Sequence, residues 1–81
     1  MERVIFRKWR RGERDVIALF PGIDEGRGLC RSYMHVGQHG AADYMHVVRL
    51  TTPAQPAEYS DLAAELRERG YDLDIRQRRP S

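Results

Sequence analysis

Hydrophobic and polar positions predict two strands at the start of the chain. Residues 3–9 (RVIFRKW) alternate and are rich in β-branched and aromatic side chains, which is typical of a strand with one buried face. Residues 16–21 (VIALFP) are continuously apolar, so we expect a central strand that ends at Pro21, because proline donates no ladder hydrogen bond. The charged, glycine-containing residues 10–15 between them predict a hairpin turn.

A third strand is predicted over residues 29–36 (LCRSYMHV), after a glycine-rich acidic loop at residues 22–28. Alternation places residues 30, 32, 34 and 36 on one face and residues 29, 31, 33 and 35 on the other. Residues 41–50 (AADYMHVVRL) fit both a helix and, in their second half, a strand. We expect a short helix over residues 41–48, followed by a connector that contains two prolines.

The clearest predicted element is a helix over residues 56–70. Pro56 suits the first helical position, and Gly70 suits the left-handed position that ends a helix. Glu65 and Arg69 are spaced to form an ion pair one turn apart. An apolar stripe follows the spacing i, i+3, i+4, i+7 and comprises Tyr59, Leu62, Ala63 and Leu66.

Residues 71–78 (YDLDIRQR) alternate again and predict a final strand whose Tyr71, Leu73 and Ile75 face the core. The predicted order β-β-β-α-α-β indicates an α+β fold. It comprises an antiparallel sheet of about four strands packed against one main C-terminal helix as a two-layer sandwich. The last strand is expected to lie beside the first, which would bring the arginine-rich ends together. We expect one compact domain over residues 1–78 and a flexible tail at residues 79–81.

Composition narrows the functional classes. The chain has 81 residues, of which 41% are hydrophobic and 32% charged, the mix of a soluble globular domain. It contains no apolar run of membrane-spanning length and no signal-peptide pattern, so a cytoplasmic location is expected. The single cysteine, Cys30, cannot form an internal disulfide or a cysteine-built zinc site. A domain this small favours a shallow cleft, a surface patch or a dimer interface over a deep active site.

Residues 32–46 (SYMHVGQHGAADYMH) contain all three histidines of the chain. If the chain were helical from His39 onward, His39, Asp43 and His46 would share one face and could hold a divalent metal. Alternatively, Asp43 could orient a histidine as a general base beside a hydroxyl group. In a third interpretation, these polar groups only hold the junction between strand and helix together.

We favour the third interpretation, so we assign no catalytic residue and expect neither a metal nor a cofactor. The same stretch is still where a ligand or partner would first be sought. The candidates are Tyr33, His35, Gln38, His39, Asp43 and Tyr44.

The pattern SYxHVGQHGxADY, followed by EYxxLxxELxxxGYxL, resembles a family of small uncharacterised bacterial proteins. The resemblance extends from Val4 to about Arg78 and implies a complete protein rather than a fragment. His46 lies outside the pattern. The resemblance implies no activity, so function must be argued from the residues themselves.

A basic surface is the other candidate site. If the last strand lies beside the first, arginines and an aromatic side chain gather at one sheet edge, which is the composition used to bind phosphates and stack bases. A solvated, charge-protected sheet edge is the alternative. The nucleic-acid candidates are Arg7, Trp9, Arg10, Arg11, Arg76 and Arg78.

We therefore expect a small non-catalytic binding or accessory domain. Its partner would be a protein, a second copy of the chain or a nucleic acid, and no membrane is expected. The alternative is a small metal- or ligand-binding domain, with hydrolysis as one possible activity, that uses His35, His39 and Asp43.

Overall fold

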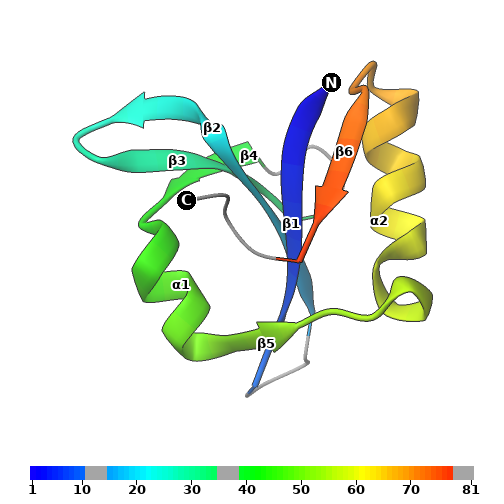
Figure 1. Cartoon of the computed structure of the whole chain (residues 1–81), viewed down its shortest axis with the longest axis horizontal. Coiled ribbons are helices and arrows are strands. Elements are labelled where there is room, and N and C mark those ends of the chain that lie inside the picture. The colour runs from blue at the N-terminus through cyan, green and yellow to red at the C-terminus, as the bar shows by residue number, and fades with distance from the viewer. Residues whose placement is uncertain (11–14, 35–38, 78–81) are drawn as a thin grey trace.

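The computed structural model of this chain describes residues 1–10, 15–34 and 39–77 (Figure 1). Strands and helices alternate after an opening run of strands, and the last strand returns to the first. The elements are β1 (Glu2–Trp9), β2 (Val16–Gly26), β3 (Leu29–Tyr33), β4 (His39–Ala42), α1 (Tyr44–Leu50), β5 (Thr51–Pro53), α2 (Pro56–Glu68) and β6 (Leu73–Arg76).

The strands form one sheet in the order β4-β3-β2-β1-β5, and β6 also pairs with β1. The outer edge of β1 is thus shared. β5 pairs antiparallel with residues 7–9, whereas β6 pairs in parallel with residues 2–5. The other pairings between described strands are antiparallel. The expectation that the last strand lies beside the first is therefore confirmed, although this pairing is parallel.

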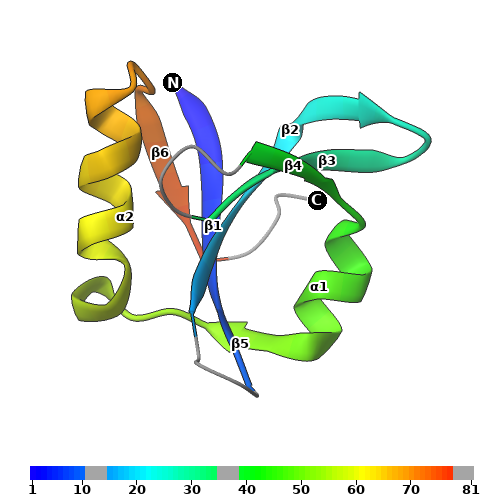
Figure 2. The same cartoon turned by 180° about the vertical axis from the view of Figure 1, so that it is seen from behind.

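The two helices cover opposite faces of the sheet, as both views show (Figures 1 and 2). Alternation along β2 explains this arrangement: Val16, Ala18 and Phe20 belong to the cluster under α2, whereas Ile17 and Leu19 pack with α1. The α+β class with a mainly antiparallel sheet is confirmed. The two-layer arrangement differs in detail, because α1 adds a layer on the second face. Neither described helix is long and apolar enough to cross a membrane.

Helix α2 forms where it was predicted. Pro56 stands at the first helical position, and Gln55 and Glu58 form a reciprocal capping box. Gly70, at φ +101°, adopts the left-handed backbone that ends the helix. Its apolar stripe packs on the sheet, and the ring of Tyr59 stacks on Phe6 with centroids 4.4 Å apart. The predicted Glu65–Arg69 pair is present at 3.9 Å.

Strand β2 is longer than predicted. It continues past Pro21 to Gly26, so most of the loop expected at residues 22–28 is strand. The pairing with β3 shifts register between Phe20 and Asp24 and again between Asp24 and Gly26. Pro21 lies within the first irregular segment, where the ladder is interrupted and a missing N–H is tolerated.

The short helix begins later than predicted, and a strand precedes it. Residues 39–42 pair with β3 as β4, and α1 begins at Tyr44, with Asp43 as its N-cap. The expected start at Ala41 is therefore wrong. Local preference does not favour a strand here, since alanine prefers helices and glycine is depleted in strands, so pairing with the open edge of β3 decides the conformation. The proline-containing connector also contributes a strand, β5.

The guanidinium of Arg7 ties β1 to the end of α1. Its Nε donates to Thr51 Oγ1 at 2.9 Å, and its Nη2 donates to the carbonyls of Thr51 at 2.8 Å and Val48 at 3.1 Å. The Thr51 hydroxyl in turn donates to the carbonyl of Val47 at 2.7 Å. Burial lowers the pKa of Arg7 below its ordinary value by desolvating the charged form. Arg7 is thus buried, and the expectation that it lies on a basic surface is wrong.

We expect Arg7→Ala to lower the free energy of unfolding by about 2–3 kcal/mol, because it leaves two buried carbonyls and a threonine hydroxyl without their donor. Urea unfolding monitored by circular dichroism measures the effect. Arg3→Ala is the matched control, since Arg3 is exposed on the same strand. Equal losses for the two variants would contradict a structural role for the Arg7 network.

Glu58 gives the fold a pH dependence. The hydrogen bond from Lys8, then that from the backbone of Gln55, lowers the pKa of Glu58 below its ordinary value of 4.5. A lowered pKa stabilises the fold above the unfolded value, and this contribution disappears as pH falls through the folded value. Glu58→Gln retains a capping side chain but removes the charge, so we expect less stability loss between about pH 5 and pH 3 than in the wild type. Thermal melting across this range measures it, and identical profiles would refute the assignment.

Candidate functional site

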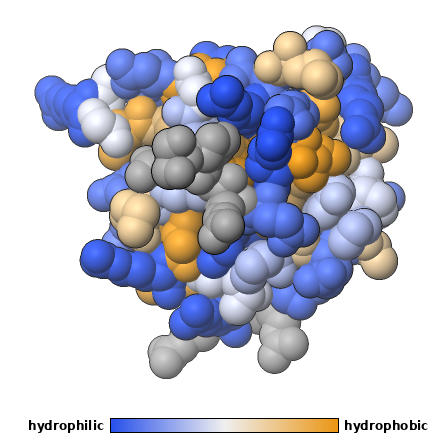
Figure 3. Space-filling model, in the orientation of Figure 1, coloured by the Kyte–Doolittle hydropathy of each residue, from blue (hydrophilic) through white to orange (hydrophobic). Residues whose placement is uncertain are grey.

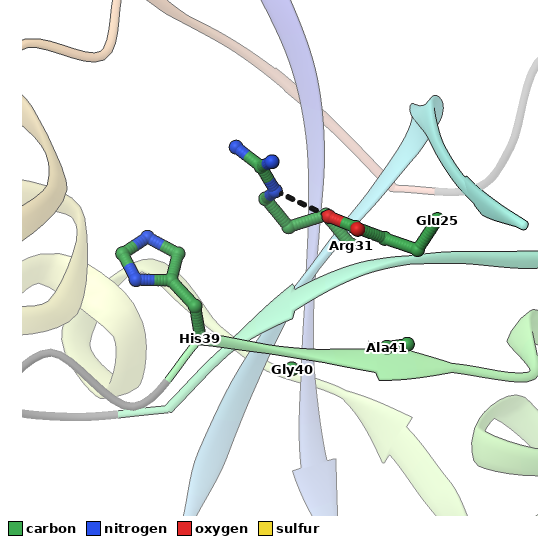
Figure 4. A pocket seen from close by; sticks show the side chains of 5 residues that line it. All are labelled: Glu25, Arg31, His39, Gly40 and Ala41. Atoms are coloured by element: carbon green, nitrogen blue, oxygen red, sulfur yellow. Dashed lines mark hydrogen bonds and ion pairs between the residues drawn. The ribbon is translucent and has the colours of Figure 1, made fainter.

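A polar pocket lies on the α2 side of the sheet, over β3 and β4. It has a volume of about 450 Å³ and is shown in Figure 4. The register pairs Arg31 with Ala41 and Tyr33 with His39, so these four side chains share one sheet face. The pocket is lined by Glu25, Arg31, His39, Gly40 and Ala41.

Side chains from three parts of the chain meet beside this pocket. The hydroxyl of Tyr71, which follows α2, lies 3.1 Å from Nε2 of His39. Nη1 of Arg31 donates to the same hydroxyl at 3.5 Å, and Nε of Arg31 donates to Glu25 at 2.7 Å. The ring of Tyr71 stacks on Phe20 with centroids 5.0 Å apart, which fixes its position. The sheet and the segment after α2 together therefore hold the imidazole in place.

Tyr71 links the other polar side chains of the pocket. Its hydroxyl accepts a hydrogen bond from Arg31 and lies within hydrogen-bond distance of Nε2 of His39, where either group can donate. The hydrogen bonds from Arg31 to Glu25 and then to Tyr71 raise the pKa of Arg31 above its ordinary value. The pocket thus offers a permanent cation, a carboxylate and an oriented imidazole to a polar ligand.

Tyr33 forms the buried floor of this region. It has no exposed surface, and its hydroxyl donates to the carboxylate of Glu65 on α2. The His39 ring meets the Tyr33 ring edge-on with centroids 4.6 Å apart. The guanidinium of Arg69 lies 5.5 Å from the centroid of Tyr33, within cation–π range. Tyr33 therefore fixes the C-terminal half of α2 against β3 and is not accessible to a ligand.

The structure separates the residues predicted from the histidine stretch. Tyr33 and His39 lie together, whereas Asp43 caps α1 by accepting a hydrogen bond from the backbone of His46 at 3.3 Å. Tyr44 packs with the cluster on the opposite face of the sheet. The predicted positions 35 and 38 (His35 and Gln38) lie outside the described residues.

The helical arrangement required for a metal triad is absent. His39 lies in a strand, while Asp43 and His46 belong to the start of α1. In residues 1–10, 15–34 and 39–77, no group of three or more histidine, cysteine or acidic side chains could hold a metal ion. The structure thus gives no support to His39, Asp43 and His46 as a metal site.

Sequence reasoning missed three members of the pocket network: Glu25, Arg31 and Tyr71. Alternation along β3 already places Arg31 on the face of Tyr33, so that signal was present. Glu25 was assigned to a loop because β2 was expected to end at Pro21. The approach of Tyr71 depends on how the chain leaves α2, and no local pattern encodes that contact.

Among the described residues, only some of the predicted basic side chains are exposed and unpaired at the sheet edge. Arg7 is buried, and Arg76 is paired with Asp74 at 3.0 Å on β6. The predicted positions 11 and 78 (Arg11 and Arg78) lie outside the described residues. Arg10 is exposed at the end of β1, whereas Trp9 is half-buried and packs against the apolar cluster under α1.

The end of α1 completes a second pocket beside Trp9. The backbone N–H of Arg10 donates to the carbonyl of Leu50 at 3.3 Å, which brings the two elements together. The resulting pocket of about 410 Å³, the Trp9 pocket, is lined by Trp9, Arg10, Arg49 and Leu50. Arg49 was absent from the predicted set, because the end of α1 was not placed beside β1.

Large apolar docking areas are not a feature of the visible surface. In the orientation of Figure 3, hydrophobic residues appear as small areas separated by hydrophilic ones. The exposed large hydrophobic residues of the described chain are Met1, Met45 and Leu50. The two pockets are consequently the more informative features.

We expect Tyr33→Phe to lower the free energy of unfolding by about 1–2 kcal/mol, since it removes a hydrogen bond to a carboxylate. Chemical denaturation measures this loss. Tyr59→Phe is the control, because the Tyr59 ring also packs on the core but its hydroxyl makes no hydrogen bond to a described residue. A Tyr33→Phe protein as stable as the control would show that the Glu65 contact contributes nothing.

Comparison of the chain with protein-family models, with curated proteins and with solved structures gives no match. The resemblance to a small uncharacterised bacterial family therefore stays a prediction. Functional inference depends on the geometry of the two pockets alone.

Proposed function

We propose that this protein is a small non-catalytic binding domain that holds single-stranded nucleic acid at the Trp9 pocket. The observation that carries the proposal is the pocket that the chain's one tryptophan lines together with Arg10 and Arg49. An indole face stacks on any base, and arginine contacts phosphates, so this composition binds single strands with little sequence preference.

A second hollow beside Trp9 supports the proposal. It has a volume of about 240 Å³ and is lined by Lys8, Trp9, Arg10 and Thr52. The two hollows share Trp9 and Arg10, and no lining residue of either is acidic, although Lys8 in the second hollow is paired with Glu58 of α2. A strand bound at Trp9 would therefore use Arg10 and Arg49 as its main phosphate contacts.

The fluorescence of Trp9 provides a direct assay of binding. We expect a short single-stranded oligonucleotide to quench Trp9 fluorescence in a saturable manner. Affinity is expected to fall as salt rises from about 50 to 200 mM, because bound phosphates release counterions. Arg49→Ala should weaken binding and reduce the slope of log affinity against log salt by about 0.7, the share of one phosphate contact.

Arg67→Ala is the matched control, because Arg67 is exposed on α2, across the sheet from α1. It should retain the affinity and the salt slope of the wild type. Absence of quenching by single-stranded DNA and RNA, or equal weakening by both arginine variants, would refute the proposal.

A further inference from the structure

Strand β4 is the outermost strand on its side of the sheet. Within the described part of the chain it pairs with β3 alone. Exposed edge strands usually carry charged side chains, proline or a bulge that prevent further pairing. Strand β4 is only four residues long, His39-Gly40-Ala41-Ala42, but it carries no lysine, acidic residue, proline or bulge. On the other side of the sheet, β6 carries Asp74 and Arg76, and β5 contains Pro53.

We propose that a second copy of this chain pairs with β4, antiparallel and about a two-fold axis, so that the two sheets become one. Edge-to-edge pairing satisfies the outward backbone groups of both strands at once. The small side chains of Gly40 and Ala41 allow close approach of the two backbones.

The two-fold axis restricts the register. Residues opposite each other in an antiparallel pair share a sheet face, so a self-paired strand must place a residue opposite one of equal parity. One solution sets Gly40 opposite Gly40 of the second copy and His39 opposite its Ala41. A shift by one step would bring Asp43 into the pairing, although its side chain already caps α1. The register centred on Gly40 is therefore favoured.

Pairing at β4 would also complete the polar pocket. Its lining includes Gly40 and Ala41 of the edge strand, so the pocket reaches the edge of the sheet. Figure 4 shows these residues beside Arg31 and Glu25. In the proposed register, His39 of the second copy lies beside Ala41 and closes the open side. The two pockets then meet across the axis as one composite site with two Arg31–Glu25 pairs. A single copy has only half of that site.

The rest of the molecule is compatible with this arrangement. The apolar cluster under α2 draws mainly on β1 and β2, so the pocket over β3 and β4 is left open. The Trp9 pocket lies where β1 meets β5, at the opposite side of the strand order. Pairing at β4 therefore leaves the nucleic-acid surface free, and the two proposals fail independently.

Sedimentation velocity over a wide range of protein concentration tests the proposal with the full chain. The wild type is expected to sediment as a dimer of twice the 9.4 kDa chain mass and to dissociate on dilution. Ala41→Lys and Ala41→Glu should each be monomeric, because two like charges would lie diagonally across the axis on the same sheet face. A mixture of the two variants should recover the dimer, since opposite charges then meet.

The mixture also separates lost pairing from lost folding, because an unfolded variant could not be rescued by its partner. Ala64→Lys is the control, since Ala64 is exposed on α2, and it should dimerise like the wild type. A wild type that is monomeric at all concentrations would overturn the proposal. A dimer that survives Ala41→Lys would overturn it too, by placing the interface elsewhere.

Discussion

The buried guanidinium of Arg7 is the contact on which the arrangement of this molecule depends. It has no carboxylate partner among the described residues, and its charge is balanced by the carbonyl dipoles at the end of α1. Cations are favourable at a helix C-terminus, so Arg7 stabilises the end of this short helix in addition to Arg49 in its own last turn. The same contacts hold Thr51 where β5 must start to pair with β1. Through this one side chain, α1 is fixed on the sheet, and Arg49 is brought beside Trp9.

The fold was predictable where local pattern and tertiary environment agree. Alternation identified β1 and β3, and capping and stripe signals identified α2, because each element buries one face in the ordinary way. The prediction was wrong at Arg7, because alternation assigns a charged position to solvent unless a buried acceptor is known. It was also wrong at residues 39–42, where pairing with β3 overrides the helix preference of the two alanines.

The residues of the candidate sites were also predictable only where local pattern and tertiary environment agree. Tyr33 and His39 were identified because both lie in one polar stretch, and strand pairing then places them together. Asp43 and His46 lie in that stretch too, but the change from strand to helix turns them away from the pocket. Tyr71 reaches His39 only because the chain returns after α2, a contact between positions that are 32 residues apart. Contacts of this kind depend on topology, so spacing along the chain cannot reveal them.

The two sides of the sheet differ for a structural reason. On the side of β1, β5 and β6 pair with different parts of the same edge of β1. Charged side chains on β6 and a proline in β5 limit further pairing on that side. On the side of β4, a side chain larger than that of Ala41 would fill the space beside Arg31, because positions 41 and 31 share a sheet face. Position 40 is restricted on the opposite face, where a Cβ would come within 3.3 Å of the Ser32 hydroxyl. Packing on both faces thus keeps these two edge residues small, and small residues leave the edge open to pairing with a second copy.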